Sequence, residues 1–131
     1  MRRPIKNTAI VLLATLALTN TVNAAELYAH ARARLLAKGL KPAPIPRGPN
    51  SPCGAEGEGD LCKKFPELVS CSGMGATSNT CRMAFVAPDG RFYVVSTYGW
   101  EDPSKMTFTA GTWANATDTR TIKDSITRGQ Q

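Results

Sequence analysis

The segment CGAEGEGDLC at 53–62 holds the densest group of potential metal ligands in the chain. Glu56, Glu58 and Asp60 take the first, third and fifth places of a calcium-type loop, and Glu67 takes the twelfth. Leucine occupies the sixth place, where the sharp turn of such a loop needs glycine, and two lysines follow the second cysteine. We therefore predict a solvated polar loop closed by a disulfide, with no metal and no cofactor. A calcium site is the alternative.

The same carboxylates are poor candidates for acid–base catalysis. A catalytic pair needs one carboxyl group in an apolar setting that raises its pKa, and acids placed between glycines in a loop lack such a setting. His30 is the only histidine and falls within a predicted helix. The sequence contains no G-x-S-x-G, H-E-x-x-H or phosphate-cradling motif. We predict no catalytic residues and a protein that is not an enzyme.

The four cysteines, Cys53, Cys62, Cys71 and Cys81, fall within 29 residues. An even number of cysteines in an exported chain indicates disulfides. The spacings of eight or nine intervening residues do not resemble the close pairs of a zinc site. The preferred pairing is Cys53–Cys62 with Cys71–Cys81, since each bridge joins cysteines near in sequence. The other two pairings stay open.

Residues 1–24 have the three parts of a secretory signal peptide. Three basic residues precede an apolar run at 9–18, and small residues at 22 and 24 predict cleavage after Ala24. The run is about half the length that a bilayer requires. We therefore expect no membrane segment after cleavage, and a periplasmic or secreted protein.

Removal of this segment also changes the charge. The formal net charge of the whole chain is +6, from 16 basic and 10 acidic residues. The signal takes three basic residues and no acids, which leaves 13 against 10 and a charge of +3. Nucleic-acid binding would need a basic stripe with interleaved aromatics. We therefore predict no nucleic-acid partner.

The remaining chain, 25–131, predicts a single α+β domain. Residues 25–38 are helical in pattern, with Leu27, Ala31 and Leu35 on one stripe, and the following glycine suits a helix end. The five prolines of 41–52 indicate an extended surface connection. Irregular structure held by disulfides is expected over 53–80.

A β-hairpin is the clearest local prediction. Residues 81–87 and 91–98 both alternate between apolar and polar positions, and Pro88-Asp89-Gly90 between them is a turn sequence. Residues 106–113 form a third strand, which completes a three-stranded antiparallel meander packed by the N-terminal helix. The polar segment 114–131 offers only two isoleucines four apart, enough for a short helix on a tail that can be flexible.

Alternation places Phe92 and Val94 on one sheet face, and we expect that face, together with Phe85, to meet the helix stripe. The opposite face would carry Tyr93, Val95 and Val86, with Trp100 or Trp113. Either the cysteine region covers that second face, or the face binds a partner. The binding hypothesis rests on residue types that are enriched at interfaces: Arg82, Arg91, Tyr93, Val95 and Trp100.

These features together predict an exported, non-catalytic binding protein. Its size, its disulfides and its small sheet suit an inhibitor or immunity protein that binds an enzyme or a toxin. One alternative is a cell-envelope assembly component or a secreted host-interaction factor. Another is a small enzyme that acts on the cell wall.

Overall fold

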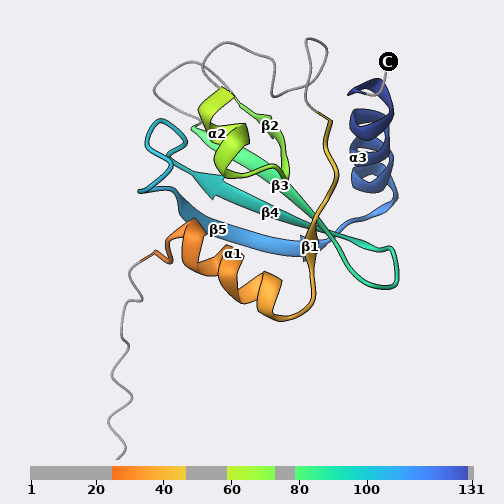
Figure 1. Cartoon of the computed structure of the whole chain (residues 1–131), viewed down its shortest axis with the longest axis horizontal. Coiled ribbons are helices and arrows are strands. Elements are labelled where there is room, and N and C mark those ends of the chain that lie inside the picture. Colours follow the sequence, from red (N-terminus) through yellow and green to blue (C-terminus); the bar gives the residue numbers. More distant parts are fainter. Residues whose placement is uncertain (1–24, 47–58, 73–78, 130–131) are drawn as a thin grey trace, which may run out of the picture.

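The computed structural model describes residues 25–46, 59–72 and 79–129, and these form an α+β fold with an antiparallel sheet (Figure 1). No helix in these three ranges is long and apolar enough to cross a membrane. The elements in chain order are α1 (Tyr28–Ala37), β1 (Lys41–Pro42), α2 (Gly59–Lys64), β2 (Leu68–Cys71), β3 (Thr80–Val86), β4 (Phe92–Tyr98), β5 (Thr107–Trp113) and α3 (Ala116–Gly129).

The sheet has five strands where the sequence predicted three. Strands β3, β4 and β5 form the predicted antiparallel meander, and β1 and β2 both pair with β3 on its other side. The expectation of irregular structure over 53–80 was therefore wrong for α2 and β2. Pro42 is accommodated in β1 because this strand lies at the edge of the sheet.

The β3–β4 hairpin is confirmed, and its register is set by a five-residue connection. Val86 lies opposite Phe92, so Phe85 lies opposite Tyr93 and Met83 opposite Val95. Gly90 has a φ of +86°, a backbone conformation that favours glycine. Residues directly opposite each other share a face of the sheet.

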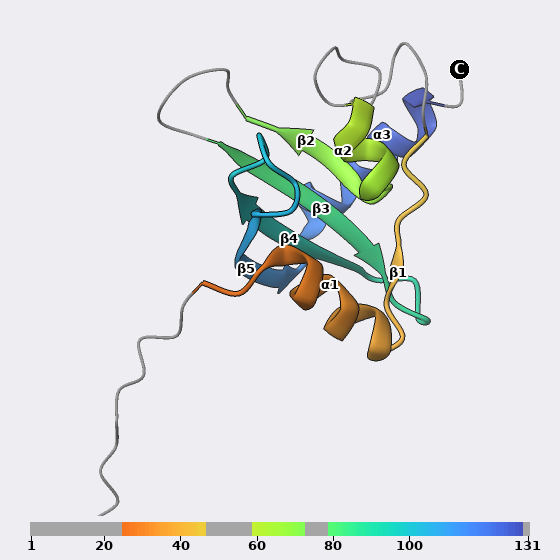
Figure 2. The same cartoon turned by 60° about the vertical axis from the view of Figure 1, so that its left-hand side comes forward.

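This register overturns the predicted assignment of sheet faces. Tyr93 and Val95, not Phe92 and Val94, lie on the face that carries α1 and α2, together with Phe85. Figure 2 shows α1 and α2 on that face and α3 on the other. The core on the α1 side contains Tyr28, Leu35, Leu40, Leu61, Phe65, Leu68, Met83, Phe85, Val95 and Met106.

The opposite face is covered as well, by α3 and by residues 43–45, which follow β1. Its core contains Ala43, Ile45, Val69, Ala84, Phe92, Val94 and Ile122. The predicted short terminal helix extends over 14 residues. Asn115 caps the start of this helix, because its side-chain oxygen accepts a hydrogen bond from the Asp118 N–H at 2.8 Å. The Asp118 carboxylate in turn accepts from Arg82 at 2.6 Å, which ties α3 to β3.

Backbone hydrogen bonds cap helix α1 at both of its ends. The Tyr28 N–H donates to the carbonyl of Met106, the residue before β5, at 2.8 Å, whereas the N-cap residue Leu27 makes no side-chain cap. At the other end Gly39 has a φ of +88°, and the Leu40 N–H donates to the Leu35 carbonyl. This is the Schellman arrangement that the sequence predicted.

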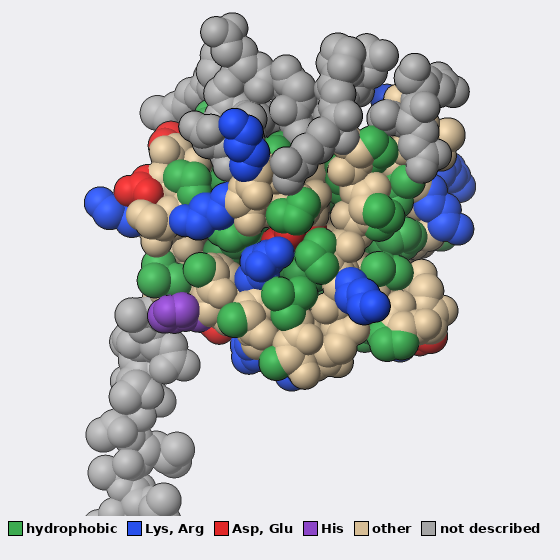
Figure 3. Space-filling view, viewed as in Figure 1, with side chains coloured by type: hydrophobic (Ala, Val, Ile, Leu, Met, Phe, Trp, Pro, Cys, Tyr) green, Lys and Arg blue, Asp and Glu red, His purple; other side chains and the backbone are tan. Residues whose placement is uncertain are grey.

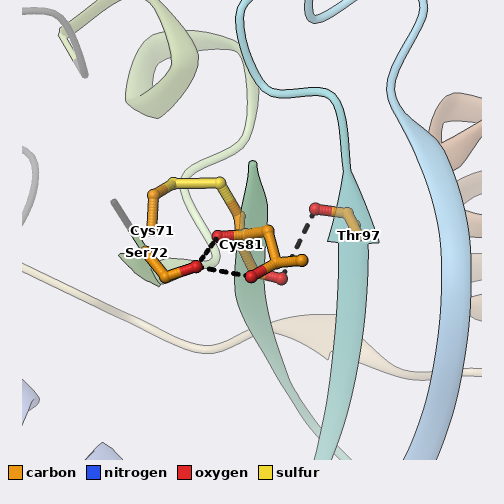
Figure 4. The surroundings of a disulfide bond; sticks show 5 residues. Cys71, Ser72, Cys81 and Thr97 are labelled. Carbon is orange, nitrogen blue, oxygen red and sulfur yellow. Dashed lines mark hydrogen bonds between the residues drawn. A yellow bond between two sulfur atoms is a disulfide. The ribbon is translucent and has the colours of Figure 1, made fainter. Parts of the chain in front are cut away.

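The predicted Cys71–Cys81 disulfide is present and joins β2 to β3 (Figure 4). Nearby, the Thr97 hydroxyl donates to the Cys81 carbonyl at 3.4 Å, and Ser72 Oγ donates to the Thr80 carbonyl at 3.2 Å. Cys62 is disulfide-bonded too, but its predicted partner Cys53 lies outside the described residues. A disulfide is compatible with an oxidising compartment.

Candidate binding cleft

A cavity of about 470 Å³ opens at one end of the sheet, between the second half of α1, the β3–β4 turn and the end of β5. We call it the basic–aromatic cleft. Three cationic side chains, one acid and two aromatic rings surround an aliphatic floor. Its lining residues are Arg34, Leu35, Lys38, Leu40, Ala87, Pro88, Asp89, Arg91, Tyr93 and Trp113.

The β3–β4 turn holds Arg91 in place on one side of the cleft. The Asp89 carboxylate accepts from the Arg91 backbone N–H at 3.1 Å and from its Nε at 2.6 Å. These two hydrogen bonds lower the pKa of Asp89. The guanidinium carbon of Arg91 lies 4.1 Å from the centroid of the Trp113 ring, within the range of a cation–π contact. The turn therefore orients both a charge and an aromatic surface.

Tyr93 forms the aromatic wall, and Gly111 makes room for it. The Tyr93 and Trp113 rings pack edge to face, with centroids 5.2 Å apart. A Cβ atom at position 111 would lie 2.5 Å from the Tyr93 hydroxyl oxygen and 2.8 Å from ring atom Cε1. The phenol ring can therefore lie across β5 only because position 111 has no side chain.

The other two cations are Arg34 in α1 and Lys38, the C-cap residue that follows the helix. They are four residues apart, about one turn, and lie on the same side of the helix. Arg34 donates to Glu26 at 3.0 Å, and its guanidinium carbon lies 5.8 Å from the Phe108 ring centroid. Lys38 is exposed and has no acidic partner in the part of the chain that the structure describes. Asp89 is the only acid among the lining residues, against three cations.

The cleft is suited to an anionic group attached to something apolar. Aliphatic and aromatic side chains supply desolvated contact area, and Arg and Trp are the residue types most often found at the energetic centres of interfaces. On the face seen in Figure 3, lysine and arginine side chains lie between hydrophobic ones. Trp113 is 45% exposed, although it is a large aromatic residue.

Two of the five predicted binding residues, Arg91 and Tyr93, lie together at this cleft. Val95 is fully buried in the core, so a partner cannot reach it. Arg82 is on the opposite face and is ion-paired with Asp118. Trp100 packs against the core on the α1 side and does not line the cleft.

Sequence reasoning missed Arg34 and Lys38, and it did not choose Trp113 over Trp100. The spacing of the two cations on α1 was a usable signal, because residues four apart on a helix share a face. No local pattern could have shown which strand end lies beside that face. That depends on the path of α1 across the sheet.

Glu67 has a structural position, and its carboxylate does not face a cation site. Its side chain is fully buried and accepts from the Tyr28 hydroxyl at 2.7 Å and from Arg32 Nε at 2.6 Å. Glu67, the twelfth residue of the proposed calcium loop, is thus hydrogen-bonded by two side chains of α1. Glu56 and Glu58 lie outside the described residues, as does the side chain of Asp60.

His30, the purple side chain in Figure 3, is exposed on α1. Within residues 25–46, 59–72 and 79–129, no three His, Cys, Asp or Glu side chains gather into a group that could hold a metal ion.

Comparison of the chain with protein-family models, with curated proteins and with solved structures found no match. Any function assigned to the cleft therefore follows from the chemistry of its own residues.

Proposed function

We propose that this is an exported, non-catalytic protein that binds another protein through the basic–aromatic cleft. The observation that carries the proposal is the composition of the cleft: three cations, one acid and two aromatic rings around an aliphatic floor. Desolvated aromatic and arginine side chains anchor protein interfaces, and surrounding charges select the partner and speed its association. An enzyme or a toxin with an acidic surface is the kind of partner that this cleft suits.

The inhibitor or immunity role follows from that binding mode together with the sequence. The signal-like segment 1–24 and the Cys71–Cys81 disulfide are compatible with a periplasmic or secreted site of action. In this proposal α1 and the β3–β5 meander form a rigid platform, which limits the ordering cost of binding. A protein that occupies another protein's active site needs no catalytic residues of its own.

The test begins with cross-linking in the exported fraction, followed by purification of the cross-linked species. We expect one stoichiometric partner whose catalytic or toxic activity falls when the purified protein is added. Lys38→Glu and Arg91→Glu should abolish both the cross-link and the loss of activity.

Lys123→Glu is the matched control, because it makes the same change of charge at an exposed position of α3, away from the cleft. It should keep the partner. A partner that tolerates both cleft variants, or whose activity is unaffected, would contradict the proposal.

A further inference from the structure

The edge of β5 beside the cleft offers backbone groups for another strand. β5 is the last strand of the meander and pairs with β4 on one side. On its other side, within the described part of the chain, β5 pairs only with residues 26 and 27: Leu27 bridges Thr107, and the Phe108 N–H donates to the Glu26 carbonyl at 2.7 Å. From Thr109 to Trp113 no backbone hydrogen bond to that side is found among the described residues.

The register shows which residues of β5 point their backbone outward. The Ala114 N–H donates to the Phe92 carbonyl at 2.9 Å, so these opposite residues form a hydrogen-bonded pair. Bonded and non-bonded pairs alternate along an antiparallel ladder. Trp113 and Gly111 therefore belong to non-bonded pairs, and their N–H and C=O groups face away from β4. The Trp113 carbonyl accepts a long hydrogen bond from the Thr112 hydroxyl at 3.4 Å, and within the described ranges no backbone group pairs with the outward N–H and C=O groups of Gly111 and Trp113, so an added strand could bond them.

The same two residues border the basic–aromatic cleft. The Trp113 side chain lines it, and Gly111 lies beneath the Tyr93 ring that forms its wall. Directly opposite residues of neighbouring strands direct their side chains to the same face. An added residue opposite Trp113 would thus project its side chain to the face that holds Arg91 and Lys38.

We propose that the partner contributes an extended acidic segment that adds to the sheet along β5 and places a carboxylate in the basic–aromatic cleft. This inference rests on the proposed function and specifies its chemistry. Backbone hydrogen bonds to Gly111 and Trp113 would supply affinity, and the cleft cations would select an acidic side chain in the strand position that faces them. Alternate residues of the segment, two apart, would face the cleft.

A second copy of this chain is a poorer occupant of the edge. Residues 107–113 contain no acidic side chain, so pairing of two β5 strands would bring no carboxylate to either cleft. The excess of cations in the cleft favours an acidic segment from another protein. Self-association is therefore an outcome that the experiment must be able to detect.

The experiment uses short synthetic peptides with alternating Thr and Glu, and a matched series with Lys in place of Glu. Binding to the purified exported protein is followed by calorimetry and by NMR of the backbone amides. We expect the acidic peptide to bind and to shift and protect the amides of Gly111 and Trp113. N-methylation of alternate residues should abolish binding in one register and spare it in the other. The Lys peptide should not bind.

Two pairs of variants separate the edge from the cleft. Trp113→Ala and Trp113→Pro both remove the indole, but only the proline variant also removes the outward N–H. An edge strand tolerates proline at such a position. Trp113→Pro should bind the acidic peptide about fivefold more weakly than Trp113→Ala, the effect of about one hydrogen bond. Lys38→Glu should weaken binding about tenfold, and Lys123→Glu should not.

Several results would overturn the strand-addition inference. These are the absence of binding to the acidic peptide, equal binding of acidic and basic peptides, and indifference to both N-methylation registers. Sedimentation that shows a dimer with protected Gly111 and Trp113 amides would assign the edge to a second copy instead. A further outcome is that the cross-linked partner fails to bind the Lys38→Glu variant and yet binds the Trp113→Pro and Trp113→Ala variants equally well. In that case strand addition is wrong and the proposed function stands. If the partner tolerates both Lys38→Glu and Arg91→Glu, the proposed function itself fails.

Discussion

Replacing Gly111 with alanine should damage the cleft while leaving the fold intact. The new Cβ would lie 2.5 to 2.9 Å from three atoms of the Tyr93 side chain. Comfortable contact begins near 3.5 Å, so the phenol ring must move by about 1 Å. Tyr93 is partly exposed and can move toward solvent. The displaced ring would leave its edge-to-face contact with Trp113 and enter the space that a ligand needs.

The cost in stability should be small, because two effects oppose each other. Overpacking costs about 1–3 kcal/mol, and replacing a strand glycine with alanine recovers about 0.5–1 kcal/mol. The backbone permits the change, since Gly111 is not among the glycines with positive φ. We expect a net loss of stability of about 2.5 kcal/mol at most, measured by urea unfolding.

Binding is the more sensitive measurement for this variant. Affinity for the cross-linked partner should fall about tenfold, a loss typical of a contributing interface residue. Thr112→Ala, at the neighbouring exposed position of β5, is the control and should bind normally. Near-ultraviolet circular dichroism reports whether the aromatic pair has separated. A changed aromatic signal with unchanged affinity would show that the Tyr93 wall is not a contact surface.

Three further predictions concern the fold. Burial and the Glu67 charge raise the pKa of Tyr28, so the folded protein keeps the phenol proton at pH values where the unfolded chain begins to lose it. The free energy of unfolding should therefore fall above about pH 10, by up to about 1.4 kcal/mol per pH unit. Tyr28→Phe should remove that slope in unfolding experiments at successive pH values. Replacing Cys71 and Cys81 together with serine should cost about 2–3 kcal/mol in the same assay, because the bridge closes a loop of ten residues; a fully reduced wild type of undiminished stability would refute this. Ile122→Ala should cost about 2–5 kcal/mol because this α3 side chain is 2% exposed and packs against the sheet, whereas Lys123→Ala should stay within about 0.5 kcal/mol. Equal effects would mean that α3 does not cover the sheet.

The elements of the meander could be predicted from sequence, but the faces of the sheet could not. Alternation locates β3 and β4 correctly, because period two survives in any half-buried strand. Which residues of the two strands share a face depends on the number of residues in the connection. The register pairs Val86 with Phe92, which turns Tyr93 and Val95 toward α1. An apolar pattern on both faces gave no hint of this.

The packing of α3 on the second face of the sheet could not be predicted from local sequence patterns either. The sequence showed Ile122 and Ile126 at helical spacing in a polar segment. Ile122 is buried and Ile126 partly buried in the cluster that contains Phe92 and Val94, and Arg82 of β3 pairs with Asp118 of α3, so these contacts exist only in the assembled fold. For the same reason Arg82, predicted as a binding residue, is placed in a structural contact.

The most direct test of the basic–aromatic cleft is the affinity of the cross-linked partner for Arg91→Glu, measured by calorimetry beside Lys123→Glu. Arg91 stacks on Trp113 and is anchored by Asp89, so its reversal changes both the charge and the aromatic surface of the cleft. We expect Arg91→Glu to weaken binding at least about tenfold while Lys123→Glu binds like the wild type. Equal affinities for the two variants would contradict a binding role for this cleft.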